Sequence, residues 1–410
     1  LPDPEQRARE NDFLASAELL ISAPARWQHR LTGYEYNHRR LNDDENADQS
    51  GFPSGGCDNT NFSFIDCPFL TTAHINRAGF MYQGDYTPRT WAQTTVGYEF
   101  EDENGRFFTD AKSFNPFTEF TQFIPAVWLN HAAYVEQRLT WRRLSAIAGV
   151  RYAHHETFGD KAVPRVAFSL LALKGRTIFS GTRLRFSYAA GIKEPRFEEA
   201  FASVPPLILP NRNLKAEENR AFEAGFEQGL LGGKYTVSGA YFNNQFHNQI
   251  NFVIVNPKTF AGQYQNIDKS MTQGAEFQVA GRLSSRLSLN GGYLYTSSKA
   301  LSGASEGQPL LRRPKHSGNL LLTYLGSRWG ANLGGSFVGR RPDSDFLGFN
   351  IDHAAGYARV DVGGWYAIHS RVTAYANVEN ALNDHYNEVV GYPALSANFR
   401  AGLRFRIGGE

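Results

Sequence analysis

Long segments of strict two-residue alternation constrain the fold of this chain more than any other feature. In the last segment, Phe399, Leu403 and Phe405 alternate with Arg400 and Arg404. Successive residues of a strand point to opposite faces, so the pattern predicts one apolar and one polar face. Similar segments cover 92–101, 183–188, 234–242, 286–295 and 330–340. No segment of comparable length has helical periodicity, and we therefore predict an all-β fold.

Strand length and the spacing of the connections indicate a membrane barrel. The alternating segments run for about 9–14 residues, whereas strands of soluble proteins average about 5–6 and a tilted membrane-spanning strand needs about 9–11. Short connections are expected near 23–26, 84–89, 139–143, 174–177, 229–234, 281–286, 325–329 and 368–371. Long connections are expected near 39–69, 102–124, 153–164, 192–216, 245–265, 298–314, 341–356 and 381–395. Short periplasmic turns that alternate with long outer loops are typical of antiparallel transmembrane barrels.

Composition agrees with this prediction and excludes two other classes of protein. The chain has 31 Phe and 19 Tyr residues, many of them near segment ends, as expected for aromatic girdles in contact with outer-membrane lipid. No apolar run approaches the roughly 18 residues of a spanning helix. The formal net charge is +2 with the signs interspersed. No basic patch stands out in the sequence, so we do not expect nucleic-acid binding.

The number of predicted strands is odd. We count about 17 strands; the first runs toward the periplasm and the last also ends there. Bacterial single-chain barrels have even strand numbers, and an open edge in lipid is costly. We therefore expect residues 1–410 to form a single, partial barrel domain, and an odd number of further strands to precede Leu1.

Two cysteines occupy one Asn-, Asp- and Gly-rich stretch. Cys57 and Cys67 lie ten positions apart, which suits a local disulfide in an oxidising compartment. The alternative is two unrelated free thiols. A zinc site is not expected, because no CxxC or nearby His pair would complete it.

Four stretches between about 190 and 407 resemble the TonB-dependent receptors in order and spacing. The first, YAAGIKEPRFEEAF with NRNLKAEENRAFEAGFE, matches the family at Pro195, Asn213, Glu217 and Glu223. The second, YQNIDKSMTQGAEF, matches at Gly274 and Glu276. The third is RRPKHSGNL, with Arg313. The fourth, NVENALNDHY, is similar to a motif near the end of the family and contains Asn380.

This resemblance implies both a fold and a function. The family has 22 strands and a plug domain that fills the lumen, so five strands, the plug and the TonB box would precede Leu1. It implies energised uptake of a scarce nutrient across the outer membrane of a Gram-negative-type bacterium, with the TonB complex as partner and no required cofactor. RRPKH and GRRPDSDF look most like vitamin B12 and siderophore receptors, which suggests cobalamin or a ferric siderophore as ligand. The matched residues are expected to be mainly structural.

Two groups of loop residues are candidate binding sites. The acidic run with Asp43, Asp44, Glu45 and Asp48 offers oxygen donors for Ca²⁺, and the vitamin B12 receptors that this chain resembles use loop calcium; a solvated acidic loop is the alternative. Aromatic side chains of the outer loops could form an apolar rim for a large ligand, or pack on each other or in the outer girdle. These aromatic residues are Phe52, Phe62, Phe64, Phe117, Phe120, Tyr386 and Tyr392.

Two alternative functions remain from the sequence. A passive porin would have the same strands without a plug. A barrel enzyme could use His154 or His155, which stand beside Glu156. The sequence has no HExxH, GxSxG, P-loop or dinucleotide fingerprint, so we do not predict an enzyme.

Overall fold

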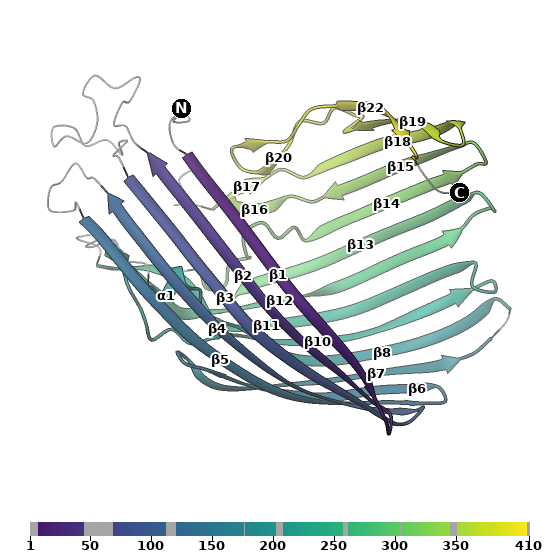
Figure 1. Cartoon of the computed structure of the whole chain (residues 1–410). Coiled ribbons are helices and arrows are strands. Elements are labelled where there is room, and N and C mark those ends of the chain that lie inside the picture. The colour runs from purple at the N-terminus through teal and green to yellow at the C-terminus, as the bar shows by residue number, and fades with distance from the viewer. Residues whose placement is uncertain are drawn as a thin grey trace, which may run out of the picture.

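The computed structural model describes residues 7–44, 69–111, 120–175, 177–201, 208–256, 261–303, 305–344 and 351–407. These residues form one large curved sheet with short turns at one end and long loops at the other (Figure 1). The sheet has 18 strands in the described part of the chain, of which β9 (Ile208–Leu209) is a two-residue parallel addition to β12. The other 17 strands pair antiparallel with their neighbours in chain order. The all-β prediction and the strand number are therefore confirmed for these residues.

The strands of this meander are β1 (Arg7–Ala23), β2 (Trp27–Asp44), β3 (Phe69–Arg89), β4 (Ala92–Ala111), β5 (Phe120–Trp141), β6 (Leu144–His155), β7 (Gly159–Leu173), β8 (Phe179–Lys193), β10 (Glu217–Leu230), β11 (Tyr235–Asn256), β12 (Ala261–Arg282), β13 (Leu287–Ala300), β14 (His316–Leu325), β15 (Trp329–Val338), β18 (Tyr357–His369), β19 (Val372–Glu379) and β22 (Asn398–Phe405). The long loops contain the short helix α1 (Phe197–Phe201) and two small hairpins, β16 (Arg341–Ser344) with β17 (Ile351–Ala354), and β20 (Asn387–Val389) with β21 (Tyr392–Pro393).

Many strands, among them β1 to β5, β11 and β12, are longer than the sequence pattern predicts. β5, β11 and β12 each have 22 residues, and the pairing of β4 with β5 continues to Ala111 and Phe120. Much of the long connections expected at 102–124, 153–164 and 245–265 is therefore strand, and those boundaries were wrong. The outer parts of these strands, such as EDENGRFFTD in β4, carry polar residues on both faces. Without a lipid-facing side they lack the alternation from which we inferred strands.

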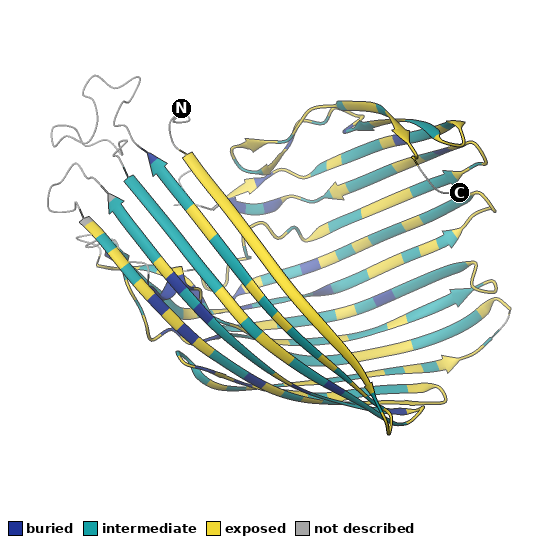
Figure 2. Ribbon diagram, in the orientation of Figure 1, coloured by how far each residue is buried: buried dark blue, intermediate teal, exposed yellow. Residues whose placement is uncertain are grey.

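The pairing register separates an inner polar face from an outer apolar face. On the inner face the hydroxyl of Tyr34 in β2 reaches over β3 to Glu101 in β4, at 2.5 Å. Such a contact between strands that are not neighbours is expected on the concave side of a curved sheet. Residues at the intervening positions, including Val135 in β5 and Leu184 in β8, remain exposed on the outer face. Exposed and half-buried positions accordingly alternate along many strands (Figure 2).

The two ends of the sheet are not paired with each other in the described part of the chain. There β1 pairs with β2 alone and β22 with β19 alone. Almost every residue of β1 is exposed, as Figure 2 shows. Because the 17 strands alternate in direction, β1 and β22 run the same way. Among the described residues, no helix has the length and apolar character needed to cross a membrane.

Candidate functional site

The loop between β8 and β10 folds onto the inner face of the sheet at the long-loop end. Its helix α1 places Phe197 against Trp128 of β5, with ring centroids 4.1 Å apart. Phe197 is 2% exposed, and Leu214 later in the same loop is 1% exposed. Burying these side chains contributes a few kcal/mol, since each large apolar residue is worth about 1.5–3 kcal/mol.

The same loop is also fastened to β12. The backbone N–H of Lys215 donates to Asn266 Oδ1 at 2.7 Å, and Asn266 Nδ2 donates to the Lys215 carbonyl at 2.8 Å. The side-chain amide of Asn211 donates to the Tyr264 carbonyl at 2.8 Å. The loop therefore contacts both β5 and β12 on the inner face of the sheet, at the long-loop end.

A group of charged residues lies on the inner wall beneath this loop. Arg77 in β3 contacts Glu103 in β4 at 2.6 Å, and Glu103 is only 3% exposed. Glu194, the residue that follows β8, faces the same group. Burial, with further effects from Glu101 and Glu103, raises the pKa of Glu194 to about 6. The carboxylates of Glu101, Glu103 and Glu194 outnumber the guanidinium groups of Arg77 and Arg151, so the wall here favours positive charge.

His155 is buried beside Glu194. Its Nδ1 accepts a hydrogen bond from the Thr157 N–H at 3.0 Å, so the neutral ring carries its proton on Nε2. Nε2 lies 3.7 Å from Glu194 Oε2. His154 points to the other face, where its Nδ1 lies 2.7 Å from Asp160. His154 and His155, which the sequence suggested for a barrel enzyme, therefore lie on opposite faces of the sheet.

Three consecutive long loops meet at Asp343 in β16, whose side chain is fully buried. It accepts hydrogen bonds from Arg312 Nε, from the Ser344 N–H and from the Val390 N–H, each at 2.9 Å. Burial alone would raise the pKa of Asp343, but these hydrogen bonds hold it below its ordinary value. Asp343 thus joins the 301–315, 339–356 and 380–397 loops.

Arg341 makes a second connection between the same loops. Its guanidinium donates to the carbonyls of Asn387 at 2.9 Å and Glu388 at 2.5 Å. It also lies 5.6 Å above the Tyr357 ring, which in turn stacks on Tyr386 with centroids 3.8 Å apart. The β16–β17 and β20–β21 hairpins are therefore held in one arrangement.

Tyr386 and Tyr392 line one pocket of about 390 Å³ below the β20–β21 hairpin. Tyr386 is buried in its stack on Tyr357, whereas Tyr392 is 67% exposed. Arg359 and Glu379 also line this pocket. The structure thus brings together the two tyrosines that the sequence suggested as ligand contacts, and their role stays a prediction.

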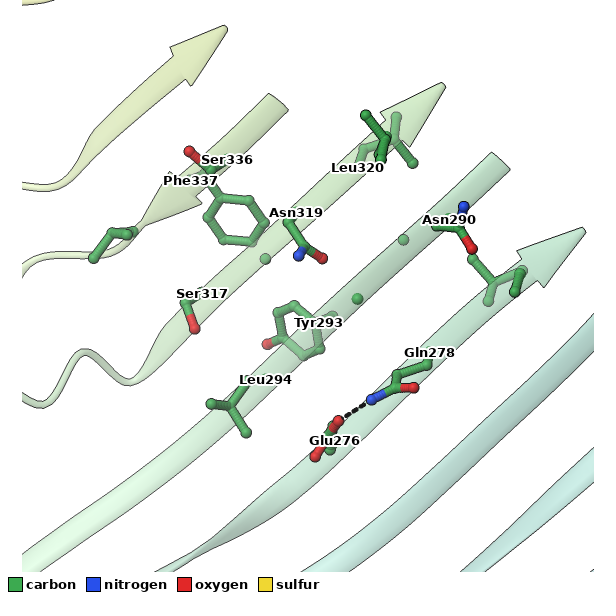
Figure 3. A pocket seen from close by; sticks show the side chains of 17 residues that line it. Glu276, Gln278, Asn290, Tyr293, Leu294, Ser317, Asn319, Leu320, Ser336 and Phe337 are labelled. Atoms are coloured by element: carbon green, nitrogen blue, oxygen red, sulfur yellow. Dashed lines mark hydrogen bonds between the residues drawn. The ribbon is translucent and has the colours of Figure 1, made fainter. Parts of the chain in front are cut away.

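A second pocket, of about 640 Å³, lies along β12–β15 and contains Glu276. Figure 3 shows Glu276 hydrogen-bonded to Gln278, with Asn290 and Asn319 on the neighbouring strands. The register places these four polar side chains on the inner face. They form a hydrogen-bonding strip along the wall of the lumen.

The other family-motif residues occupy varied environments. Pro195 is fully buried, whereas Asn213, Glu223 and Arg313 are exposed. Glu217 accepts a hydrogen bond from the Ile250 N–H at 2.7 Å and one from Lys193 at 2.8 Å.

Two of these motif positions are closely packed. An added Cβ at Gly274 would lie 1.9 Å from the Tyr295 carbonyl oxygen, so the close approach of two strands requires glycine there. Asn380 is buried and caps its own loop, with hydrogen bonds to the Asp384 and Leu395 carbonyls.

Most of the predicted loop residues lie outside the described residues: Glu45, Asp48, Phe52, Cys57, Phe62, Phe64, Cys67 and Phe117. Asp43 and Asp44 are described and are the last residues of β2. Phe120 begins β5, but its side chain is not described. The calcium site, the disulfide and most of the aromatic rim therefore stay predictions.

Comparison with known proteins assigns this all-β fold to a family of outer-membrane barrels. Residues 3–381 match the family model described as TonB dependent receptor-like, beta-barrel. The chain therefore belongs to the TonB-dependent receptor family, whose members are receptors and transporters of the Gram-negative outer membrane. The comparisons give no support to a passive porin or a barrel enzyme.

Individual relatives carry different cargoes. The metal-pseudopaline receptor CntO of Pseudomonas aeruginosa is 32% identical over 276 residues, which cover 65% of this chain and 38% of that protein. The vitamin B12 transporter BtuB of Vibrio cholerae is 24% identical over 288 residues, 68% of this chain and 42% of that protein. The chain thus spans about two fifths of the curated relatives it matches.

The solved structure of copper transporter OprC has the same fold. It superposes with a TM-score of 0.75 at 14% identity, covering 96% of this chain and 65% of that one.

Proposed function

We propose that this chain forms most of the wall and the outer mouth of a receptor for energised nutrient uptake through TonB. The match of residues 3–381 to the family carries this proposal. The inner polar wall, the loop anchored by α1 and the three outer loops joined at Asp343 support it. Together they make a rigid mouth that could capture a large, dilute ligand before transport.

The ligand that we propose is a metal-carrying organic complex, either a metal chelate of the siderophore type or cobalamin. Identity is higher to the metal-pseudopaline receptor, at 32%, than to the vitamin B12 transporter, at 24%. This difference favours a metal chelate. The Tyr392 ring and the polar groups around it would supply the apolar and hydrogen-bonding contacts that such a ligand needs.

We further propose that the intact receptor supplies strands that pair with the free edges of β1 and β22. A sheet in lipid must close, because unpaired backbone groups are costly there. The two edge strands run in the same direction, so an odd number of antiparallel strands is required between them. Five such strands, together with a plug domain and a TonB box, would complete the family architecture.

Binding to the full-length receptor tests the ligand class. Isothermal titration with ferric siderophores, other metal chelates and cobalamin should detect tight binding of a chelate. Replacement of Tyr392 by Ala should weaken it about tenfold, as expected for an exposed aromatic anchor. Leu382→Ala, an exposed change on the same loop, is the control and should bind normally. Binding of cobalamin alone would overturn the preference for a chelate, and binding of none of these ligands would overturn the proposed function.

A further inference from the structure

The short-turn end of the sheet carries exposed cations in or beside every turn. In the described part of the chain, eight short turns lie at this end, which is on the right-hand side of Figure 1. The turn cations are Arg26, Arg89, Arg142, Arg143, Lys174, Lys234, Arg282, Arg286, Arg328 and Arg371, followed by Arg404 and Arg406 in and after β22. All of them are exposed. Between the strand ends, none of the described turn residues is Asp or Glu.

The described residues do not pair these turn cations with acidic side chains. None of the turn cations forms an ion pair with a described residue, whereas Arg77 pairs with Glu103 on the inner wall and Arg312 with Asp343 among the long loops. Two turn cations instead lie over aromatic rings. Arg142 is 5.0 Å from the Trp141 ring centroid and Lys234 is 5.3 Å from that of Tyr235. Since the whole chain has a formal net charge of only +2, the positive excess is localised at this rim.

Large apolar side chains surround the same rim. Exposed aromatic residues next to the turns are Trp91, Trp141, Phe179, Trp329 and Tyr366. Aromatic residues of membrane barrels occupy the level of the lipid headgroups. The turn cations therefore lie at, or just beyond, the level of the lipid phosphates.

We propose that the turn cations bind the phosphate groups of anionic phospholipids in the membrane leaflet at the short-turn end. A guanidinium group binds phosphate oxygens through two parallel hydrogen bonds. The bound lipid would lay its acyl chains on the outer apolar face while its headgroup meets the cations. The cations are distributed one or two to a turn around the rim. This spacing suits a ring of separate headgroups better than one compact acidic protein.

The full-length receptor in lipid nanodiscs tests this proposal. Discs that contain phosphatidylglycerol and phosphatidylcholine are dissociated, and native mass spectrometry measures which lipid stays bound. We expect wild-type receptor to retain phosphatidylglycerol preferentially. Replacing Arg142, Arg143, Arg282 and Arg286 by Gln should reduce this preference by at least about tenfold, since each surface cation contributes about fivefold. The same four changes to Lys keep the charge and should keep most of the preference.

A matched control removes four exposed cations from the opposite rim, Lys269, Lys299, Lys315 and Arg340, by substitution with Gln. It should leave lipid preference unchanged. If the variant with all four Gln substitutions does not fold, the single changes Arg286→Gln and Arg371→Gln must each lower the preference for phosphatidylglycerol several-fold. Equal preference in turn and control variants would overturn the proposal. Complete displacement of the lipid by millimolar inorganic phosphate would overturn it too, because the site would then bind free phosphate rather than lipid.

Discussion

Asp343 is the residue whose contacts reach furthest through the outer loops. Asp343→Ala removes the acceptor for Arg312 and for the Ser344 and Val390 amides, leaving a cation and two N–H groups unpaired. We expect the loop assembly to lose about 3 kcal/mol, because each backbone N–H group left without an acceptor costs about 1–3 kcal/mol. Hydrogen exchange of the 387–393 amides in the full-length receptor should therefore become faster by about two orders of magnitude.

Asp352 provides the control for this prediction. It lies opposite Asp343 in the same hairpin but is exposed, so Asp352→Ala should leave exchange at 387–393 unchanged. Equal acceleration in the two variants would show that Asp343 does not join the loops.

Glu194 makes docking of the β8–β10 loop pH-dependent. Its native pKa of about 6 lies above the ordinary value of 4.5, so the docked state binds the proton more tightly than the undocked state. Docking is then strongest below about pH 4.5 and weakens as pH rises through 6. Because the side chain is 41% exposed, solvent screening limits the effect to about 1 kcal/mol.

Hydrogen exchange within α1 at pH 5 and pH 7 measures this dependence. Exchange corrected for its intrinsic pH dependence should be several-fold faster at pH 7. Glu194→Gln should abolish the difference, and Glu198→Gln, an exposed change on α1, should preserve it. A difference that survives in Glu194→Gln would assign it to another group.

The sequence could reveal some of these residues but not all. Tyr386 and Asn380 were found because they stand in a motif near the end of the chain. Asp343 stands in GRRPDSDF, but a charged loop residue is ordinarily solvated, so the sequence does not predict its burial. Its burial depends on Val390, 47 positions later, and no local pattern records that contact. Trp128 and Phe197 were missed for the same reason.

At the scale of strands, glycines determine where aromatic side chains cross the inner wall. The Tyr34 ring lies over Gly79 of the neighbouring strand, where an added Cβ would be 2.2 Å from the ring. Gly79→Ala should displace Tyr34 and break its hydrogen bond to Glu101. The expected cost is about 2 kcal/mol, which is typical of overpacking. A lower unfolding temperature of the full-length receptor would show it.

Gly33 supplies the comparison, because an added Cβ there meets nothing within 4 Å. Gly33→Ala should leave the unfolding temperature nearly unchanged. Equal stability of the two variants would mean that Tyr34 moves without cost.

Strand identity was predictable from alternation, whereas strand ends were not. The outward faces of membrane-barrel strands are apolar only over the membrane-spanning part, so alternation in segments such as 398–405 predicts strands over that part alone. Beyond that level β4, β5 and β11 continue to pair with their neighbours. The helix α1 has only five residues, too few for a periodic signal.

At the scale of the whole molecule, the sheet distributes charge in a way that the linear sequence conceals. The turn cations number one or two in each turn, and successive turns lie some 30–60 positions apart along the chain. No basic run therefore appears in the sequence. Only the meander gathers them at one end. The strand number and parity, in contrast, followed from counting the segments, because each hairpin pairs neighbours in sequence.

Uptake by living cells tests whether the full-length receptor transports its ligand through TonB. Cells that express the full-length receptor should accumulate a radiolabelled metal chelate in a saturable manner. A protonophore, or deletion of TonB, should abolish accumulation while leaving surface binding intact. Accumulation that persists without the proton gradient and without TonB would contradict energised uptake and would indicate a passive pore.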